Sequence, residues 1–277
     1  MSEAKKVNLF VIGVNKAGSS WLYYLLKQHP QIFMSEIKEL YYFDEKYPEK
    51  LEEYHSNFPF EKDYQYFGEA TPTYYRKRST AEKIKEYSPN ARVMAIVRDP
   101  IQRLRSQFYY HKQLDIIPEK MTIEEAIEDR NSHLIQDSHY EKSLPEFRKI
   151  FGKNFMVFSL EKAIENTEKM WKELQDFLGI MVIDLPELSQ KSENATGSSL
   201  FRMIYKYTIR PVKKRSPKLY RKLLQMKSMR KSKKLLLKIL GKADKKDISE
   251  ELYSKLELEF QPTYRYLEKL GYDKIYK

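Results

Sequence analysis

The sequence has 277 residues, of which 41% are hydrophobic and 14% aromatic, and this is enough for one or two globular domains. It contains no cysteine, which excludes a disulfide framework, a thiolate nucleophile and a thiolate metal site. The formal net charge of +12 is concentrated in residues 202–246, where Asp244 is the only acidic residue, so the charge says little about the rest of the chain.

No targeting or membrane-spanning segment is predicted. Residues 1–8 lack the apolar region of a secretory signal. The apolar runs, such as 235–237, are far shorter than the ~20 residues that a spanning helix needs. We therefore expect a soluble, cytoplasmic protein.

Hydrophobic patterning predicts alternating strands and helices over the first 180 residues. Strands are expected at 7–14, 91–98 and 154–160, and helices at 19–28, 101–113 and 165–178. The alternation predicts an α/β fold with a parallel sheet and right-handed crossovers. Ligands in such folds bind beyond the carboxyl ends of the strands.

The stretch VIGVNKAGSSWLYYLL, residues 11–26, joins the first strand to the first helix. Gly13 and Gly18 have the spacing of a nucleoside triphosphate loop, but Ser19 stands where that loop has its lysine, and Lys16 comes three positions early. The start of a helix binds phosphate through its N–H groups and its dipole. The early position of Lys16 favours a loop that holds one phosphate rather than several. The Lys16 ammonium would then lie beside the reacting bond of the bound phosphate compound.

A second phosphate site is indicated by VRDPIQRLRSQFYYH, residues 97–111. Arg98 ends a predicted strand, and Ser106 follows on the next helix. A guanidinium binds phosphate through two hydrogen bonds, and a serine adds a neutral donor. The alternative is a capped helix start, with Asp99 as the N-cap and Pro100 in the first turn. Both interpretations can hold together.

Two further segments carry acidic and aromatic residues. In KELYYFD, residues 38–44, Glu39 could take a proton from an acceptor hydroxyl, or Glu39 and Asp44 could be surface charges beside an aromatic patch. In YFGEATPTYY, residues 66–75, Tyr74 could line a cleft or belong to the core or its rim.

These segments together resemble the family of sulfotransferases that use 3′-phosphoadenosine 5′-phosphosulfate (PAPS). KAGSS, residues 16–20, resembles the family's 5′-phosphosulfate loop, K-x-G-[ST]-[ST]. Residues 97–111 are similar to its 3′-phosphate clamp, R-D-P-x-x-R-x-x-S. Residues 38–44 resemble the K-E-x-x-x-F-D segment of heparan-sulfate-type and bacterial members, in which the glutamate is the general base. Residues 66–75 are similar to the run that lines the acceptor cleft, although Ala70 replaces the lysine of heparan-modifying members.

The resemblance implies a P-loop-type parallel sheet and transfer of a sulfuryl group from PAPS to a hydroxyl or amine, without a metal. The acceptor implied is a carbohydrate or a glycolipid. Catalysis is then expected from Lys16 and Glu39, and acceptor binding from Lys38, Asp44 and Tyr74. Donor binding is expected from Lys16, Ala17, Gly18, Ser19, Ser20, Trp21, Arg98, Ser106, Thr196 and Gly197.

The C-terminal part is harder to interpret. A single domain 1–277 is expected, with a core at 7–180, a basic helical segment at 202–246 and a closing helix at 248–270. The basic segment could be a solvated helical insertion, or it could contact an anionic membrane or an acidic glycan. No nucleic-acid recognition module is visible.

Two other functions remain open for the same sequence. A P-loop kinase would need Mg-ATP and a lysine after Gly18, and the residue there is Ser19. A catalytically idle, anion-binding protein on this fold would not need Lys16, Glu39 and Arg98 together.

Overall fold

A computed structural model describes residues 5–129, 133–186 and 248–272. The chain divides into two compact units, one of Met1–Leu104, Ile135–Leu188 and Leu256–Lys277, and the other of Arg105–Leu134 and Ser189–Lys255. Among the described residues, no helix is both long and apolar enough to cross a membrane.

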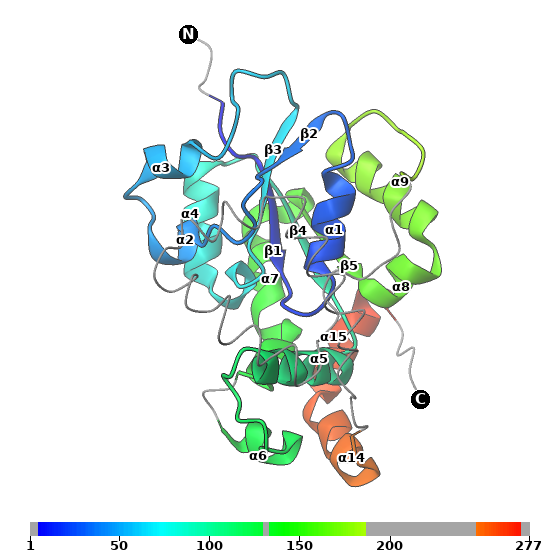
Figure 1. Cartoon of the computed structure of the whole chain (residues 1–277). Helices are drawn as coiled ribbons and strands as arrows, with labels where there is room; N and C mark the ends of the chain where they lie inside the picture. Colours follow the sequence, from blue (N-terminus) through cyan, green and yellow to red (C-terminus); the bar gives the residue numbers. More distant parts are fainter. Residues whose placement is uncertain (1–4, 130–132, 187–247, 273–277) are drawn as a thin grey trace, which may run out of the picture. The chain divides into compact units, whose positions relative to one another are not determined.

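The first unit is built around a parallel sheet of five strands in the order β2-β3-β1-β4-β5. The predicted α/β fold with a parallel sheet is therefore confirmed. Figure 1 shows the sheet between helices on both faces. The strands are β1 (Leu9–Gly13), β2 (Ile32–Met34), β3 (Tyr66–Ala70), β4 (Arg92–Val97) and β5 (Phe155–Ser159).

The helices of this unit connect the strands or follow the last of them. They are α1 (Ser19–Leu26), α2 (Tyr42–Glu45), α3 (Leu51–His55), α4 (Arg78–Tyr87), α7 (Tyr140–Phe151), α8 (Leu160–Glu165), α9 (Thr167–Leu178) and α15 (Gln261–Lys269), with 3-10 turns at Tyr74–Arg76, Gln136–Ser138 and Gly152–Asn154. Helices α5 (Pro100–Gln113) and α14 (Glu250–Glu259) extend into the second unit, which also contains α6 (Ile123–Glu128).

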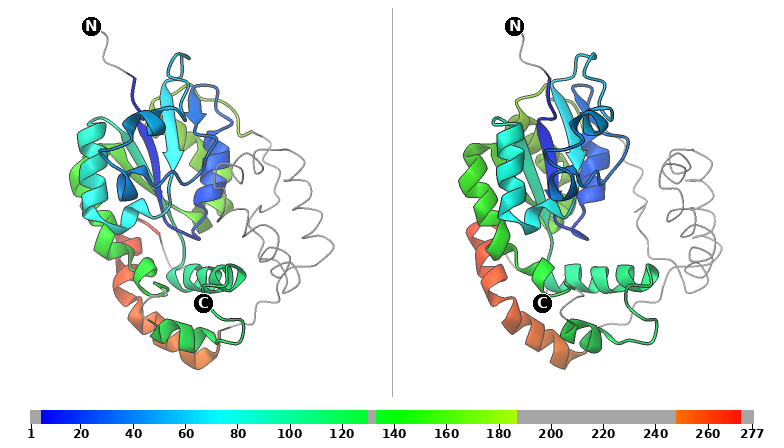
Figure 2. Two further views of the ribbon diagram at one scale, coloured as in Figure 1. Left: turned by 60° about the vertical axis from the view of Figure 1, so that its left-hand side comes forward. Right: turned by 90° about the vertical axis from the view of Figure 1, so that its left-hand side faces the viewer.

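The alternation of side chains along the strands forms two cores. Phe10 and Ile12 of β1 belong to one buried cluster, which includes α4 and α7, whereas Leu9 and Val11 belong to the other, which includes α1 and α9. The two further views in Figure 2 show the same layered arrangement of helices and sheet. Burying both faces explains why β1, β4 and β5 are almost continuously apolar.

Three details differ from the predicted elements. The short strands β2 and β3 were not predicted. The helix expected at 165–178 is preceded by α8, and Asn166 separates the two helices by accepting the N–H of Lys169 at 2.9 Å. The closing helix is interrupted at Phe260, because Pro262 has no N–H to continue the helical hydrogen bonds of α14.

Candidate active site

The loop between β1 and α1 lies at the carboxyl edge of the sheet, beside the end of β4. The N–H of Val14 donates to the carbonyl of Ile96 at 2.8 Å. Gly18 has φ 103°, a conformation that other residues rarely adopt, and a Cβ there would also require the Leu160 side chain, 2.8 Å away, to shift. The backbone conformation explains one fixed position of the K-x-G-[ST]-[ST] pattern physically.

Helix α1 begins at this loop without a side-chain cap. Gly18 occupies the N-cap, and no acidic residue lies in the first turn. The N–H groups that begin a helix lack partners within it, so an anion can bind them here. Ala17 differs from the rest of the predicted cradle, because its N–H already donates to the carbonyl of Val14 at 3.2 Å. Ser19 is buried, and Trp21 is half-buried against the core beneath α1.

Lys16 and Glu39 share an unusual backbone conformation. Their φ angles are 68° and 66°, in the left-handed region that residues other than glycine rarely adopt. Such residues are enriched at functional sites, where the surrounding structure holds them in place. The observation supports a functional role for both residues.

Segment 38–44 lies beside the same loop. Lys38 Nζ donates to Ser20 Oγ at 2.6 Å, and the N–H of Glu39 donates to the carbonyl of Ala70 at the end of β3, at 3.0 Å. The predicted phosphate loop and the predicted base are therefore adjacent in the first unit. Burial lowers the pKa of Lys38, against the opposing effect of the Glu39 carboxylate 3.8 Å away.

The carboxylate of Glu39 is held on both of its oxygens. Lys38 Nζ lies 3.8 Å from Oε1, and the Tyr41 hydroxyl donates to Oε2 at 2.7 Å. The side chain remains 39% exposed, so an acceptor can approach it. Tyr41 is a site residue that the sequence analysis missed, because an ordinary aromatic position in KELYYFD gives no sign of this bond.

Arg98 follows β4 directly, at the same edge of the sheet. Its guanidinium forms no hydrogen bond or ion pair with the described residues, although its carbonyl accepts the Tyr140 hydroxyl at 2.9 Å. A half-buried guanidinium of this kind can bind an anion through two parallel N–H donors. Ser106 belongs to the second unit, so its pairing with Arg98 stays a prediction.

The capped helix start predicted as the alternative for this segment is also present. Asp99 Oδ1 accepts the N–H of Gln102 at 2.8 Å, and Pro100 is the first residue of α5. The Tyr264 hydroxyl donates to Asp99 Oδ2 at 2.9 Å. The next arginine of the motif, Arg103, is completely buried, and its Nε donates to Ser138 Oγ at 2.6 Å. The motif therefore combines a candidate anion ligand with structural residues.

The two remaining acceptor candidates are held by protein groups. Asp44 accepts hydrogen bonds from the Thr73 and Thr80 hydroxyls at 2.9 and 2.8 Å. Tyr74 is completely buried, which favours the core position considered as its alternative. The acceptor contacts of Lys38, Asp44 and Tyr74 stay predictions. Thr196, Gly197 and the basic segment 202–246 lie outside the described residues.

A second carboxyl, Glu69 of β3, is buried near this edge. Burial raises its pKa to about 7 from an ordinary 4.5, against hydrogen bonds from Tyr54, Thr71 and Tyr74. Between pH 4.5 and 7 the folded protein therefore keeps a proton that the unfolded chain has lost. Stability from this group is fully present below pH 4.5 and is lost as the pH rises to 7.

The first prediction concerns this titration. Between pH 4.5 and 7, the free energy of unfolding of the wild type should fall by on the order of 3 kcal/mol relative to that of Glu69→Gln. The reason is that one pKa unit corresponds to about 1.4 kcal/mol. Urea unfolding of both proteins across this range measures the difference. Parallel pH profiles for the two proteins would show that Glu69 keeps an ordinary pKa.

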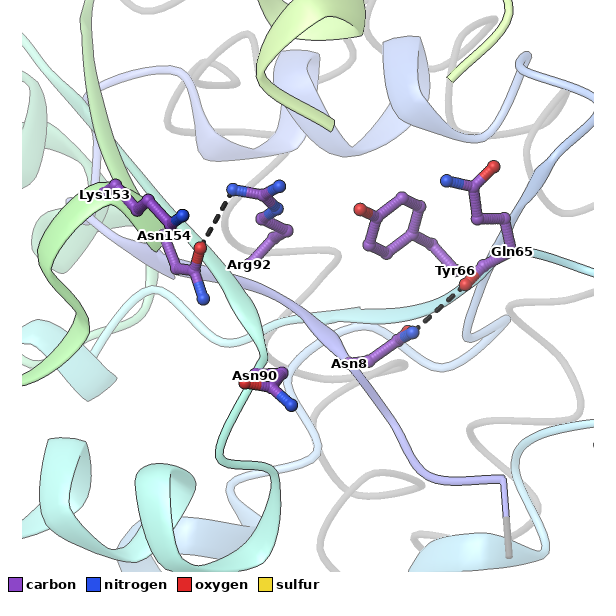
Figure 3. A pocket seen from close by; sticks show the side chains of 7 residues that line it. All are labelled: Asn8, Gln65, Tyr66, Asn90, Arg92, Lys153 and Asn154. Carbon is purple, nitrogen blue, oxygen red and sulfur yellow. Dashed lines mark hydrogen bonds between the residues drawn. The ribbon is translucent and has the colours of Figure 1, made fainter. Parts of the chain in front are cut away.

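A polar hollow of about 440 Å³ lies at the opposite edge of the sheet, where the strands begin (Figure 3). Asn8 Nδ2 donates to the carbonyl of Gln65 at 3.0 Å, and Arg92 donates to Asn154 Oδ1 at 2.9 Å. Its lining groups thus serve to join the starts of the strands.

Among the described residues, no cluster of three or more His, Asp or Glu side chains could hold a metal ion.

Comparison with known proteins places these features in a family context. Residues 6–270 match the family described as "Sulfotransferase domain". The chain is 35% identical over 109 residues to the membrane-associated sulfotransferase kil1 of Dictyostelium discoideum, covering 38% of this chain and 23% of that protein. It is 30% identical over 179 residues to human heparan sulfate glucosamine 3-O-sulfotransferase 3B1, covering 61% of this chain and 45% of that protein.

The chain thus spans less than half the length of these two relatives. A solved sulfotransferase from Alicyclobacillus acidocaldarius superposes with a TM-score of 0.59 and 20% identity, covering 69% of this chain and 87% of that one. At this identity the likeness shows a shared fold.

Proposed function

This chain belongs to the sulfotransferase family, and we propose that it transfers a sulfuryl group from PAPS to a hydroxyl or amine of a carbohydrate or glycolipid. One observation carries the proposal. The hydrogen bond from Lys38 Nζ to Ser20 Oγ brings the uncapped start of α1 next to Glu39. A site for an anionic donor and a candidate base for an acceptor therefore lie side by side.

The donor fits the residues at this edge. The start of α1 takes the 5′-phosphate, and Lys16 lies within the same loop. Arg98 follows the neighbouring strand β4 at the same edge of the sheet, which supports its guanidinium as a ligand for the 3′-phosphate of PAPS. The resemblance to the family adds Ser106, Thr196 and Gly197 as predicted donor contacts.

In the proposed reaction Glu39 takes the proton from the acceptor hydroxyl as the acceptor oxygen attacks sulfur. The bond between sulfur and the bridging oxygen of the 5′-phosphate breaks, and the electron pair stays on that oxygen. Lys16 stabilises the charge that grows there, where stabilisation of the transition state lowers the barrier most effectively. Lys38 and Tyr41 hold the Glu39 carboxylate in position.

A carbohydrate acceptor is supported by the similarity to the human heparan sulfate glucosamine sulfotransferase. Ala70, at the position where heparan-modifying members carry lysine, favours a less anionic glycan or a glycolipid.

We also propose a cytoplasmic location, with the basic segment 202–246 contacting an anionic membrane or an acidic glycan.

Two alternatives remain, a kinase that uses Mg-ATP and an idle anion-binding protein. Ser19, where a kinase loop needs lysine, opposes the kinase. The juxtaposition of Glu39 with the loop opposes the idle protein, because anion binding alone requires no carboxylate there.

Incubation with sulfur-labelled PAPS and a panel of glycans, glycolipids and phenols tests the proposed function. We expect label in at least one carbohydrate acceptor, without added metal. Label recovered only in phenols would contradict the carbohydrate proposal. Label that stays in unreacted PAPS, with inorganic sulfate formed no faster than without the protein, would favour the idle protein.

The second prediction concerns the 3′-phosphate. Arg98→Ala should cost on the order of 1.5–3 kcal/mol of affinity for 3′,5′-adenosine bisphosphate, because a charge-assisted pair is lost. Binding of adenosine 5′-monophosphate should change little. Calorimetric titration of both variants with both nucleotides measures this. Arg92→Ala, at the other end of β4, is the matched control. Equal losses for both nucleotides would assign Arg98 a structural role.

A further inference from the structure

The buried carboxyl of Glu69 takes no part in the reaction described above. Its side chain is 1% exposed and accepts hydrogen bonds from the Tyr54 hydroxyl at 2.8 Å, Thr71 Oγ1 at 3.0 Å and the Tyr74 hydroxyl at 3.2 Å. No lysine, arginine or histidine of the described residues forms an ion pair with it. A buried acidic group without a cation is costly, so its retention calls for an explanation.

The surroundings of Glu69 lead directly to segment 38–44. The Tyr74 hydroxyl donates to Glu69 and accepts the N–H of Phe43 at 3.2 Å. The neighbouring residue Ala70 accepts the N–H of Glu39 at 3.0 Å. The segment that carries the proposed base is therefore fastened to β3 and the turn after it near both of its ends.

The direction of these hydrogen bonds gives Glu69 its importance. The Tyr74 phenol has one hydroxyl proton and donates it to Glu69. Its oxygen lone pairs are then available to accept the N–H of Phe43. Without an acceptor at Glu69 the hydroxyl loses its fixed orientation. The backbone of the segment then loses one of its attachments, and Glu39 loses its fixed distance from the loop.

We propose that Glu69 is a positioning residue for Glu39, acting through the Tyr74 hydroxyl and the backbone N–H of Phe43. The inference rests on the proposed role of Glu39 as the base. A reacting group displaced by about 1 Å can lose on the order of 10² in rate, so a buried anchor of this kind affects turnover without touching the acceptor.

Amide hydrogen exchange of peptides covering 38–44 tests the attachment itself, independently of any activity. In Tyr74→Phe and in Glu69→Leu, which leaves the Tyr74 hydroxyl without its acceptor, these amides should exchange several-fold faster than in the wild type. Tyr54→Phe is the matched control, because it removes another hydroxyl from Glu69 but keeps the ring that stacks on Tyr42 at 4.1 Å. In this control, exchange of 38–44 should stay within about twofold of the wild type.

Unchanged exchange of 38–44 in Tyr74→Phe would overturn the proposal, as would an equal acceleration in all three variants. If Glu69→Leu does not fold, unchanged exchange in Tyr74→Phe still overturns the proposal. The result does not depend on whether the protein transfers sulfuryl groups, so failure of the proposed function and failure of this inference are distinguishable.

Kinetics on an acceptor identified with labelled PAPS then measure the consequence. Both Tyr74→Phe and Glu69→Leu should lower kcat about tenfold and leave the affinity for adenosine bisphosphate within about twofold. A folding defect would not give this difference between kcat and affinity. The double variant should be no slower than the slower single variant, because the two changes interrupt one path. Multiplying effects, or equal losses in kcat and nucleotide affinity, would contradict a positioning role.

Discussion

Glu39→Gln should lower turnover about 10²–10⁴-fold while leaving the affinity for adenosine bisphosphate unchanged. Glutamine is nearly isosteric with glutamate but cannot take the proton of the acceptor. Steady-state kinetics with labelled PAPS, together with calorimetric nucleotide binding, measure both effects.

The competing explanation is that Glu39 only pairs with Lys38, whose Nζ lies 3.8 Å away. In that case Glu39→Gln would lose thermal stability but keep its activity per folded molecule. Glu36→Gln is a suitable control, because Glu36 lies three residues earlier and forms an exposed ion pair with Lys27. Turnover of Glu39→Gln within about threefold of the wild type would exclude Glu39 as the base.

Lys16→Ala should lower kcat by ~10²–10³, on the precedent of removing a group that stabilises developing negative charge. Affinity for adenosine bisphosphate should fall much less, because Lys16 acts mainly when the bond between sulfur and oxygen breaks. Lys27→Ala, at the other end of α1, is the control and should behave as the wild type. Single-turnover kinetics and calorimetry separate the two effects.

Equal losses in kcat and in nucleotide affinity would assign Lys16 an anchoring role instead. The φ angle of 68° at Lys16 makes a second comparison useful. Lys16→Gly can adopt this conformation without strain, so it should be at least as stable as Lys16→Ala and equally slow. A faster Lys16→Gly variant would show that part of the alanine effect comes from the backbone.

The fold was predictable where the sequence pattern is local. The apolar runs predicted β1, β4 and β5, and Gly18 with its neighbours predicted the loop before α1. Strand β2 has three residues, too few for a pattern to emerge. Strand β3 includes Gly68 and the buried Glu69, which makes it unlike an apolar strand. Both were recognisable only once their neighbours in the sheet were in place.

The site was predictable to a similar extent. The positions of Lys16, Glu39 and Arg98 follow from motifs that are contiguous in the sequence. The bonds that hold segment 38–44 join residues distant in the sequence, such as Tyr74 with Phe43 and Ala70 with Glu39. A hydroxyl far along the chain carries no sign of its partner, so these contacts could come only from the structure.

Calorimetric titration with adenosine bisphosphate, ATP and Mg-ATP tests the central claim, a donor site built for PAPS, without needing an acceptor. The account predicts that adenosine bisphosphate binds in the presence of a metal chelator. Its affinity should exceed that of ATP by at least about tenfold, as a charge-assisted contact to the 3′-phosphate implies. Tighter binding of Mg-ATP than of adenosine bisphosphate, with affinity that depends on Mg²⁺, would contradict the account and favour a kinase.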